Sequence, residues 1–122
     1  MNIGLTYTST TVVDNSNTAK ALGSGDMDVF ATPAMVALME NAAMNAVAPH
    51  LEVGQTTVGT KISTSHIKAS ALGATITATA VLTAVDGRCL TFEIIARDGE
   101  NTIGEGVHTR FVVDRERFIA KL

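Results

Sequence analysis

Cysteine, proline, aromatic side chains and excess positive charge are all scarce in this chain. Its 122 residues include one Cys, two Pro, one Tyr, four Phe and no Trp. A single thiol excludes an intrachain disulfide and a zinc site built from cysteines, and Cys89, in a strand-like pattern, is expected to be structural. The nine Lys and Arg are scattered and the net charge is −3, so we expect no nucleic-acid partner.

Long hydrophobic runs are also missing. No stretch reaches the length of a membrane span, and no apolar run follows the first methionine as a secretory signal requires. We therefore expect a cytoplasmic protein without a membrane partner. The length fits one domain, residues 1–122, in which an oligomer interface supplies part of the apolar burial. Three histidines without clustered spacing give no metal signature.

One segment has the composition of a buried helix. Thr32 followed by Pro33 predicts its start, because the threonine hydroxyl can cap free backbone N–H groups and proline suits the first helical position. The helix should end near Ala48, before Pro49. Nearly all of its faces are apolar or small, so we expect the helix to be buried on nearly all faces and covered by a sheet. Two neighbouring stripes follow helical spacing: Met35, Met39, Ala42 and Ala46, and Val36, Glu40, Ala43 and Val47.

Glu40 is the charged member of these stripes. A carboxylate among apolar side chains must be paired, hydrogen-bonded or neutralised, because desolvation disfavours its charged form. Such a group is suited to proton transfer or nucleophilic attack. A structural ion pair with Lys61 or Lys68 is the alternative, but buried pairs contribute little net stability. The pattern therefore favours a functional role for Glu40.

From Thr56 onward the sequence alternates with period two and is rich in threonine, as is typical of β-strands. Asp86-Gly87 and Asp98-Gly99 predict tight turns and hence an antiparallel meander. Asp14–Asp28 is expected to be a loop that leads into the helix and contributes to a lid. The predicted strands are Leu5–Val13, Thr56–Ala69, Gly73–Val85, Arg88–Arg97 and Thr102–Asp114.

The order strand, loop, helix and four antiparallel strands predicts an α+β fold. An apolar helix is stable in water only if the sheet covers it, which gives a hot-dog fold with about five strands wrapped around one long helix. A single sheet leaves its edges exposed. Pairing of two edges across a two-fold axis would remove that liability, so we expect a homodimer.

Many short motifs match a known group of enzymes. They are Ala31-Thr32-Pro33, Met39-Glu40, Ala48-Pro49-His50-Leu51-Glu52, Gly59-Thr60, Thr64-Ser65-His66, Val85-Asp86-Gly87-Arg88, Asp98-Gly99, Ile103-Gly104-Glu105-Gly106-Val107-His108, Arg110 and Arg117-Phe118. With these motifs the chain resembles the hot-dog thioesterases of the fluoroacetyl-CoA thioesterase type. The family's phenylalanine lid, however, is replaced here by Leu22-Gly23-Ser24-Gly25-Asp26.

The resemblance implies three catalytic residues: a threonine at the helix start, a glutamate eight positions later and a strand histidine. These fall on Thr32, Glu40 and His66. It also implies that the backbone N–H of Gly59 binds an oxyanion, and we place Pro33 and Thr60 in the same oxyanion and substrate-binding region. Because eight helical residues rise by about 12 Å, Thr32 and Glu40 cannot touch directly if the helix runs unbroken from Thr32. Either the substrate bridges them or the helix starts later.

The implied activity is hydrolysis of a small or moderate acyl-CoA thioester, without a metal or redox cofactor. Glu40 would act as general base or as nucleophile, aided by His66 and Thr32. Two other functions stay open, an enoyl-thioester hydratase or dehydratase of the hot-dog type and a non-catalytic acyl-CoA-binding protein. His50 is expected in a solvated loop. For His108 an approach to the site is the alternative, but a position on the sheet surface is favoured. The cations considered for coenzyme A phosphates are Lys61, Lys68, Arg88, Arg97 and Arg110.

Overall fold

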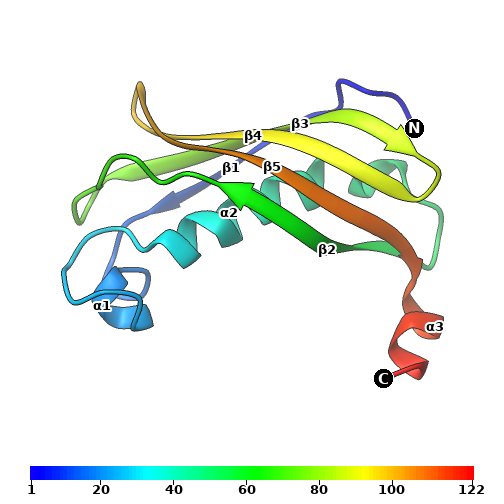
Figure 1. The fold of residues 1–122 in the computed structure, drawn as a ribbon, viewed down its shortest axis with the longest axis horizontal. Helices are drawn as coiled ribbons and strands as arrows, with labels where there is room; N and C mark the ends of the chain where they lie inside the picture. Colours follow the sequence, from blue (N-terminus) through cyan, green and yellow to red (C-terminus); the bar gives the residue numbers. More distant parts are fainter.

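One antiparallel sheet curves over one long helix in this chain (Figure 1). A computed structural model describes residues 1–122. The α+β hot-dog architecture predicted from the sequence is confirmed, with a five-stranded sheet. In chain order the elements are β1 (Thr6–Val12), α1 (Ala19–Leu22), α2 (Thr32–Val47), the 3₁₀ helix η1 (Ala48–His50), β2 (Gln55–Thr64), β3 (Thr75–Asp86), β4 (Cys89–Asp98), β5 (Asn101–Asp114) and α3 (Arg115–Ala120).

The strand order is β1-β3-β4-β5-β2. The turns at Gly87 and Gly99, with φ of 59° and 58°, join β3, β4 and β5 into the predicted meander. β2 does not pair with β3 but lies beside β5 at the far edge of the sheet. The predicted strand Thr56–Ala69 was therefore too long: it ends at Thr64, and a long connection rather than a tight turn leads to β3.

The core lies between the sheet and one face of α2. Buried methionines and small residues on this face let the strands approach closely, as the sequence predicted: Met35, Met39, Ala42, Ala43, Ala46 and Val47. The opposite face is not covered within one chain, since Ala37, Asn41 and Met44 are exposed. The expectation that nearly all faces of the helix are buried was therefore wrong. No helix of the protein has the length and apolar character that a membrane span needs.

Two short helices were not predicted. α1 forms inside the expected loop, where the Thr18 hydroxyl accepts the Ala21 N–H and Gly23 ends the turn at φ 72°. α3 follows β5 and is capped by Asp114. Both are too short to show a hydrophobic period in the sequence. They lie at opposite ends of the sheet (Figure 1).

Candidate active site

The start of α2 brings Thr32 and His66 together. Thr32 Oγ1 lies 2.7 Å from His66 Nδ1. The residue with the extended N-cap conformation is Ala31, so Thr32 and Pro33 are the first two residues of the helix. The prediction that the Thr32 hydroxyl caps the helix was therefore wrong. The hydroxyl is engaged by the imidazole instead, while Pro33 occupies a first-turn position that needs no N–H partner.

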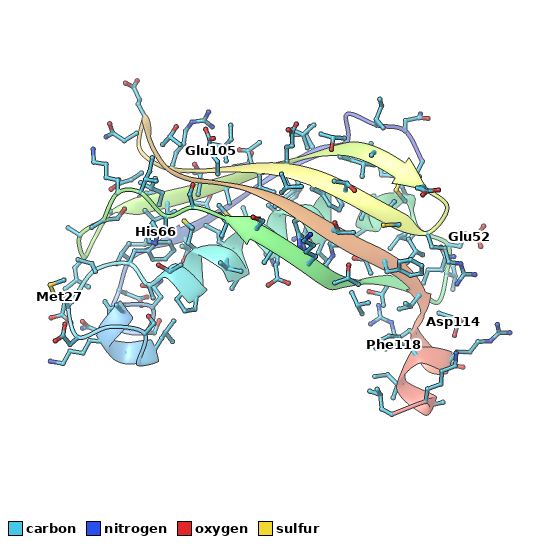
Figure 2. All side chains as sticks on the ribbon, viewed as in Figure 1. Met27, Glu52, His66, Glu105, Asp114 and Phe118 are labelled. Atoms are coloured by element: carbon cyan, nitrogen blue, oxygen red, sulfur yellow. The ribbon has the colours of Figure 1, made fainter.

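His66 is half-buried and holds one unpaired nitrogen. Its Nε2 atom is buried and has no hydrogen-bond partner, and the Phe30 ring packs edge-on against the imidazole with centroids 6.5 Å apart. Figure 2 shows His66 beside the first turns of α2. Burial lowers the pKa of His66, and the backbone of Lys68 acts in the opposite direction. The ring is thus predominantly neutral at pH 7 and able to accept a proton.

A cavity of about 260 Å³ adjoins this pair. Thr32 and His66 contribute to its polar side together with Ser24 and Lys68, and Phe30 and Ile67 contribute to its apolar side. Apolar side chains combined with a few converging polar groups are usual in a small-molecule site.

Glu40 lies two helical turns further along α2, in a second polar cluster. Its Oε2 is 3.7 Å from Arg110 Nη1, and the Arg110 side chain is 7% exposed whereas that of Glu40 is 42% exposed. The carboxylate is therefore half-exposed rather than buried. Its cationic partner is Arg110 of β5, not Lys61 or Lys68, because the guanidinium crosses the sheet face at Gly59, the residue opposite Arg110.

Gly59 provides the space in which this cluster forms. A Cβ atom at Gly59 would lie 2.9 Å from Glu40 Oε2, 3.1 Å from His108 Cε1 and 3.4 Å from Arg110 Nη1. The β2–β5 register shifts between Gly59 and Lys61, so Thr60 occupies an irregular position in the ladder. Bulges of this kind are common beside active sites, where they redirect the backbone.

The other residues predicted for the binding site are less closely involved. Thr60 is exposed and its hydroxyl donates to the Thr109 carbonyl at 3.1 Å. Pro33 is also exposed. Neither side chain contacts the Thr32–His66 pair or the Glu40–Arg110 pair through a hydrogen bond or ion pair.

Sequence reasoning missed two residues of the second cluster. His108, expected on the sheet surface, is 1% exposed, and Arg110, considered only as a contact for coenzyme A, is 6% exposed. Burial lowers the pKa of Arg110, and the Glu40 carboxylate opposes this effect. One signal was present in the sequence: His108 and Arg110 alternate along β5 in phase with the buried Val112, so all three face α2.

One chain therefore holds two separate polar clusters. The hydroxyl and imidazole of Thr32 and His66 can hold or move a proton, whereas Glu40 offers a carboxylate held near a guanidinium. Because α2 runs without a break from Thr32 to Val47, about 12 Å of helix separates Thr32 from Glu40. The three predicted catalytic residues are not brought together within one chain.

The sequence of this chain is similar to those of known thioesterases. The family model for fluoroacetyl-CoA-specific thioesterase matches residues 13–116. The fluoroacetyl-CoA thioesterase of Streptantibioticus cattleyicolor is 46% identical over 95 residues, which cover 78% of this chain and 68% of that protein.

Solved structures agree with this relationship. A crystal structure of the fluoroacetyl-CoA-specific thioesterase superposes with a TM-score of 0.92 at 40% identity, covering 99% of this chain and 94% of that one. A variant of that enzyme in complex with fluoroacetate and CoA gives 0.90 at 40% identity, covering 97% and 99%. A thioesterase superfamily member from Thermus thermophilus, 23% identical, gives 0.90 over 98% and 89%, and shares the fold.

Proposed function

We propose that this chain, which belongs to the fluoroacetyl-CoA-specific thioesterase family, hydrolyses a small or moderate acyl-CoA thioester to the free acid and coenzyme A. The observation that carries the proposal is the contact of the Thr32 hydroxyl with the His66 imidazole at the start of α2, with Glu40 on the same helix. Family membership and these side chains point to the same thioester chemistry.

Glu40 is the proposed base or nucleophile. It would either take a proton from the attacking water or attack the carbonyl carbon itself to form a mixed anhydride. The Arg110 guanidinium lies 3.7 Å from Glu40 Oε2, so a fixed positive charge stands beside the carboxylate in either role. Half-exposure of Glu40 leaves the carboxylate accessible to substrate and water.

His66 and Thr32 are the proposed groups for proton transfer and orientation. The neutral imidazole has one nitrogen at the Thr32 hydroxyl and the other unpaired, so it can accept a proton and pass it to the departing sulfur. A thiol has a pKa of about 8.5, so the leaving group needs little protonation. The N–H of Gly59 and the start of α2 are the proposed oxyanion donors.

We further propose that a homodimer completes the site. The half-site of Thr32 and His66 and the half-site of Glu40 lie about 12 Å apart along one helix, so a second copy would supply the missing member to each. The outer edges of β1 and β2 are unpaired within the chain, and one face of α2 is uncovered. Such edges and faces are typical of an isologous interface.

The cellular setting and cofactor requirement are also proposals. A cytoplasmic location fits the single free thiol, Cys89. The proposed reaction uses no metal or redox cofactor, since water, a carboxylate and an imidazole are sufficient for it. Activity should therefore be unchanged after dialysis against EDTA.

We expect this chain to differ from the fluoroacetyl-CoA-specific thioesterase in the acyl group that it binds. The family's lid phenylalanines are replaced by Leu22-Gly23-Ser24-Gly25-Asp26, and the cavity at Thr32 is lined by Phe30 and Ile67. We therefore do not propose fluoroacetyl as the natural group.

The test is release of free thiol from short, branched, aromatic and long acyl-CoAs. Wild-type protein should turn over part of this panel, and Glu40→Gln and His66→Ala should lose that activity while remaining folded. Turnover unaffected by Glu40→Gln would refute the mechanism. An inert panel, with hydration of an enoyl-CoA or with tight binding alone, would instead favour the hydratase or the binding protein.

A further inference from the structure

His108 is a buried imidazole to which the proposed reaction assigns no role. It lies on β5, is 1% exposed, and packs against the ring of Phe92 on the neighbouring strand β4. Its Nδ1 is 2.7 Å from the Lys61 carbonyl oxygen and its Nε2 is 3.2 Å from Arg110 Nη1. Both ring nitrogens therefore have partners on neighbouring positions of the sheet.

These two contacts define the protonation of the ring. A carbonyl oxygen can only accept, so Nδ1 must carry the proton that it donates to Lys61. A guanidinium can only donate, so Nε2 must present its lone pair to Arg110. His108 is accordingly a neutral imidazole in one tautomer, and protonation of Nε2 would set it against the positive charge of Arg110. Burial and the Arg110 charge lower the pKa of His108, while the Lys61 carbonyl and Glu40 oppose them.

Arg110 depends on this acceptor. Its Nε donates to the Thr57 hydroxyl at 2.8 Å and its Nη2 donates to the Thr57 carbonyl at 2.9 Å. Nη1 is the remaining nitrogen, and it lies between His108 Nε2 at 3.2 Å and Glu40 Oε2 at 3.7 Å. The contact with Glu40 is too long for a good hydrogen bond, so His108 holds the end of the guanidinium that faces the carboxylate.

We propose that His108 is a positioning residue that, as a neutral hydrogen-bond acceptor, fixes the Arg110 guanidinium beside the Glu40 carboxylate. Its influence on the reaction runs through Arg110 and rests on the proposed function of Glu40. The charged groups around His108 are Arg110 on β5 and Glu40 on α2, and Lys61 contributes its backbone carbonyl from β2. Because both ring nitrogens are occupied, His108 does not itself exchange protons with a substrate.

The first test determines, without any substrate, which ring nitrogen of His108 carries the proton. Nitrogen-15 NMR of His108 in the full protein should show a protonated Nδ1 and an unprotonated Nε2 throughout the neutral pH range. A protonated Nε2 would overturn the proposal. This result does not depend on thioesterase activity, so it separates a failure of this inference from a failure of the proposed function.

The second test uses two amide replacements with opposite hydrogen bonds. His108→Gln places an amide oxygen near the position of Nε2 and keeps an acceptor for Arg110, whereas His108→Asn keeps only a donor for the Lys61 carbonyl. Exchange of the Arg110 Nη1–H protons with water should accelerate about tenfold or more in His108→Asn and change little in His108→Gln. Equal exchange in the two variants would overturn the proposal.

Kinetics then connect this position to the reaction. His108→Asn should lower kcat roughly tenfold to a hundredfold with little change in KM, the loss expected when a hydrogen bond to a charged group is removed. His108→Gln should restore most of kcat, and the exposed His50→Asn is the matched control. If both His108 variants lose kcat and thermal stability to the same extent, the role is structural only and the inference fails.

Discussion

Replacement of Gly59 by alanine should separate the geometry of Glu40 from the stability of the fold. The new Cβ would lie 2.9 Å from Glu40 Oε2, so the carboxylate must move by about half an ångström or more to reach ordinary contact. Gly59 does not have a positive φ, so its backbone accepts alanine without strain. The atom that must move furthest is the end of a flexible, half-exposed side chain, which makes that movement inexpensive for folding. His108 Cε1, at 3.1 Å from the new Cβ, must also give by a few tenths of an ångström.

The expected changes in the free energy of unfolding and in kcat follow from this geometry. Loss of chain entropy in the unfolded state favours Gly→Ala by about 0.4–1 kcal/mol, which offsets the cost of moving the carboxylate. The free energy of unfolding should thus change by less than about 1 kcal/mol, and Tm by less than about 5 °C. Activity should fall much further, by roughly a hundredfold in kcat, because sub-ångström to 1 Å displacements of reacting groups have effects of that size.

The assay is thiol release combined with thermal unfolding of the same samples. Gly106→Ala is the matched control, since its Cβ would meet Thr64 at 3.1 Å and the Ser63 carbonyl at 3.2 Å but would not contact Glu40. It should show a comparable change in Tm and retain its activity. A Gly59→Ala protein with wild-type kcat, or one whose loss of kcat is matched by Gly106→Ala, would refute the reasoning.

Three further predictions concern Thr32, Arg110 and the two histidines His66 and His108. Thr32→Val removes the hydroxyl that contacts His66 and should lower kcat roughly tenfold or more, whereas Thr32→Ser should keep most of it, as measured by thiol release. Arg110→Lys keeps the charge but loses the paired bonds to Thr57, and urea unfolding should show a loss of about 1.5–3 kcal/mol. Because burial lowers the pKa of His66 and His108 from 6.5, the unfolded chain binds more protons below that value. Stability should therefore fall as the pH drops below about 6.5, and Tm between pH 5 and 8 should show a smaller fall in His108→Gln.

The parts of the fold that were predictable are those set by neighbours in the sequence. Thr32 and Pro33 mark the start of α2, and its end before Pro49 follows from the same local rules. The Asp-Gly turns give the two hairpins that join β3, β4 and β5, because a tight turn leaves the next strand no other neighbour.

The position of β2 could not be predicted in this way. Ten residues, 65–74, separate β2 from β3, and a connection of that length does not specify which strand β2 will pair with. The Ser65 and Ile67 N–H groups bond to carbonyls of Glu105 and Ile103, so the chain continues along β5 after the regular ladder ends. Pairing of β2 with β5 is in turn what sets Gly59 opposite Arg110.

In the candidate site, too, some residues could be identified from the sequence, whereas their contacts depend on strand pairing. Glu40 was identified by its place among apolar helix residues, and Thr32 and His66 through the family resemblance. The surroundings of Glu40, in contrast, come from strands that are distant in sequence. Lys61 lies on β2, and only the β2–β5 register places its carbonyl beside His108, whereas Arg110 stands two residues from His108 on β5 itself. Period-two alternation indicates that His108 and Arg110 face inward, but it does not tell which groups they meet.

The helix α2 and the sheet fix different features of the candidate site. Within one chain the length of α2 fixes the distance from the Thr32 hydroxyl to Glu40, so in the proposed dimer a substrate meets Thr32 and His66 of one copy and Glu40 of the other. The direction of the Glu40 carboxylate is set on the sheet side, by Arg110 and the space above Gly59. Variation at Gly59, His108 or Arg110 should therefore act mainly on kcat, whereas variation in Leu22–Asp26 or Ile67, near the cavity at Thr32, should act on the choice of acyl group.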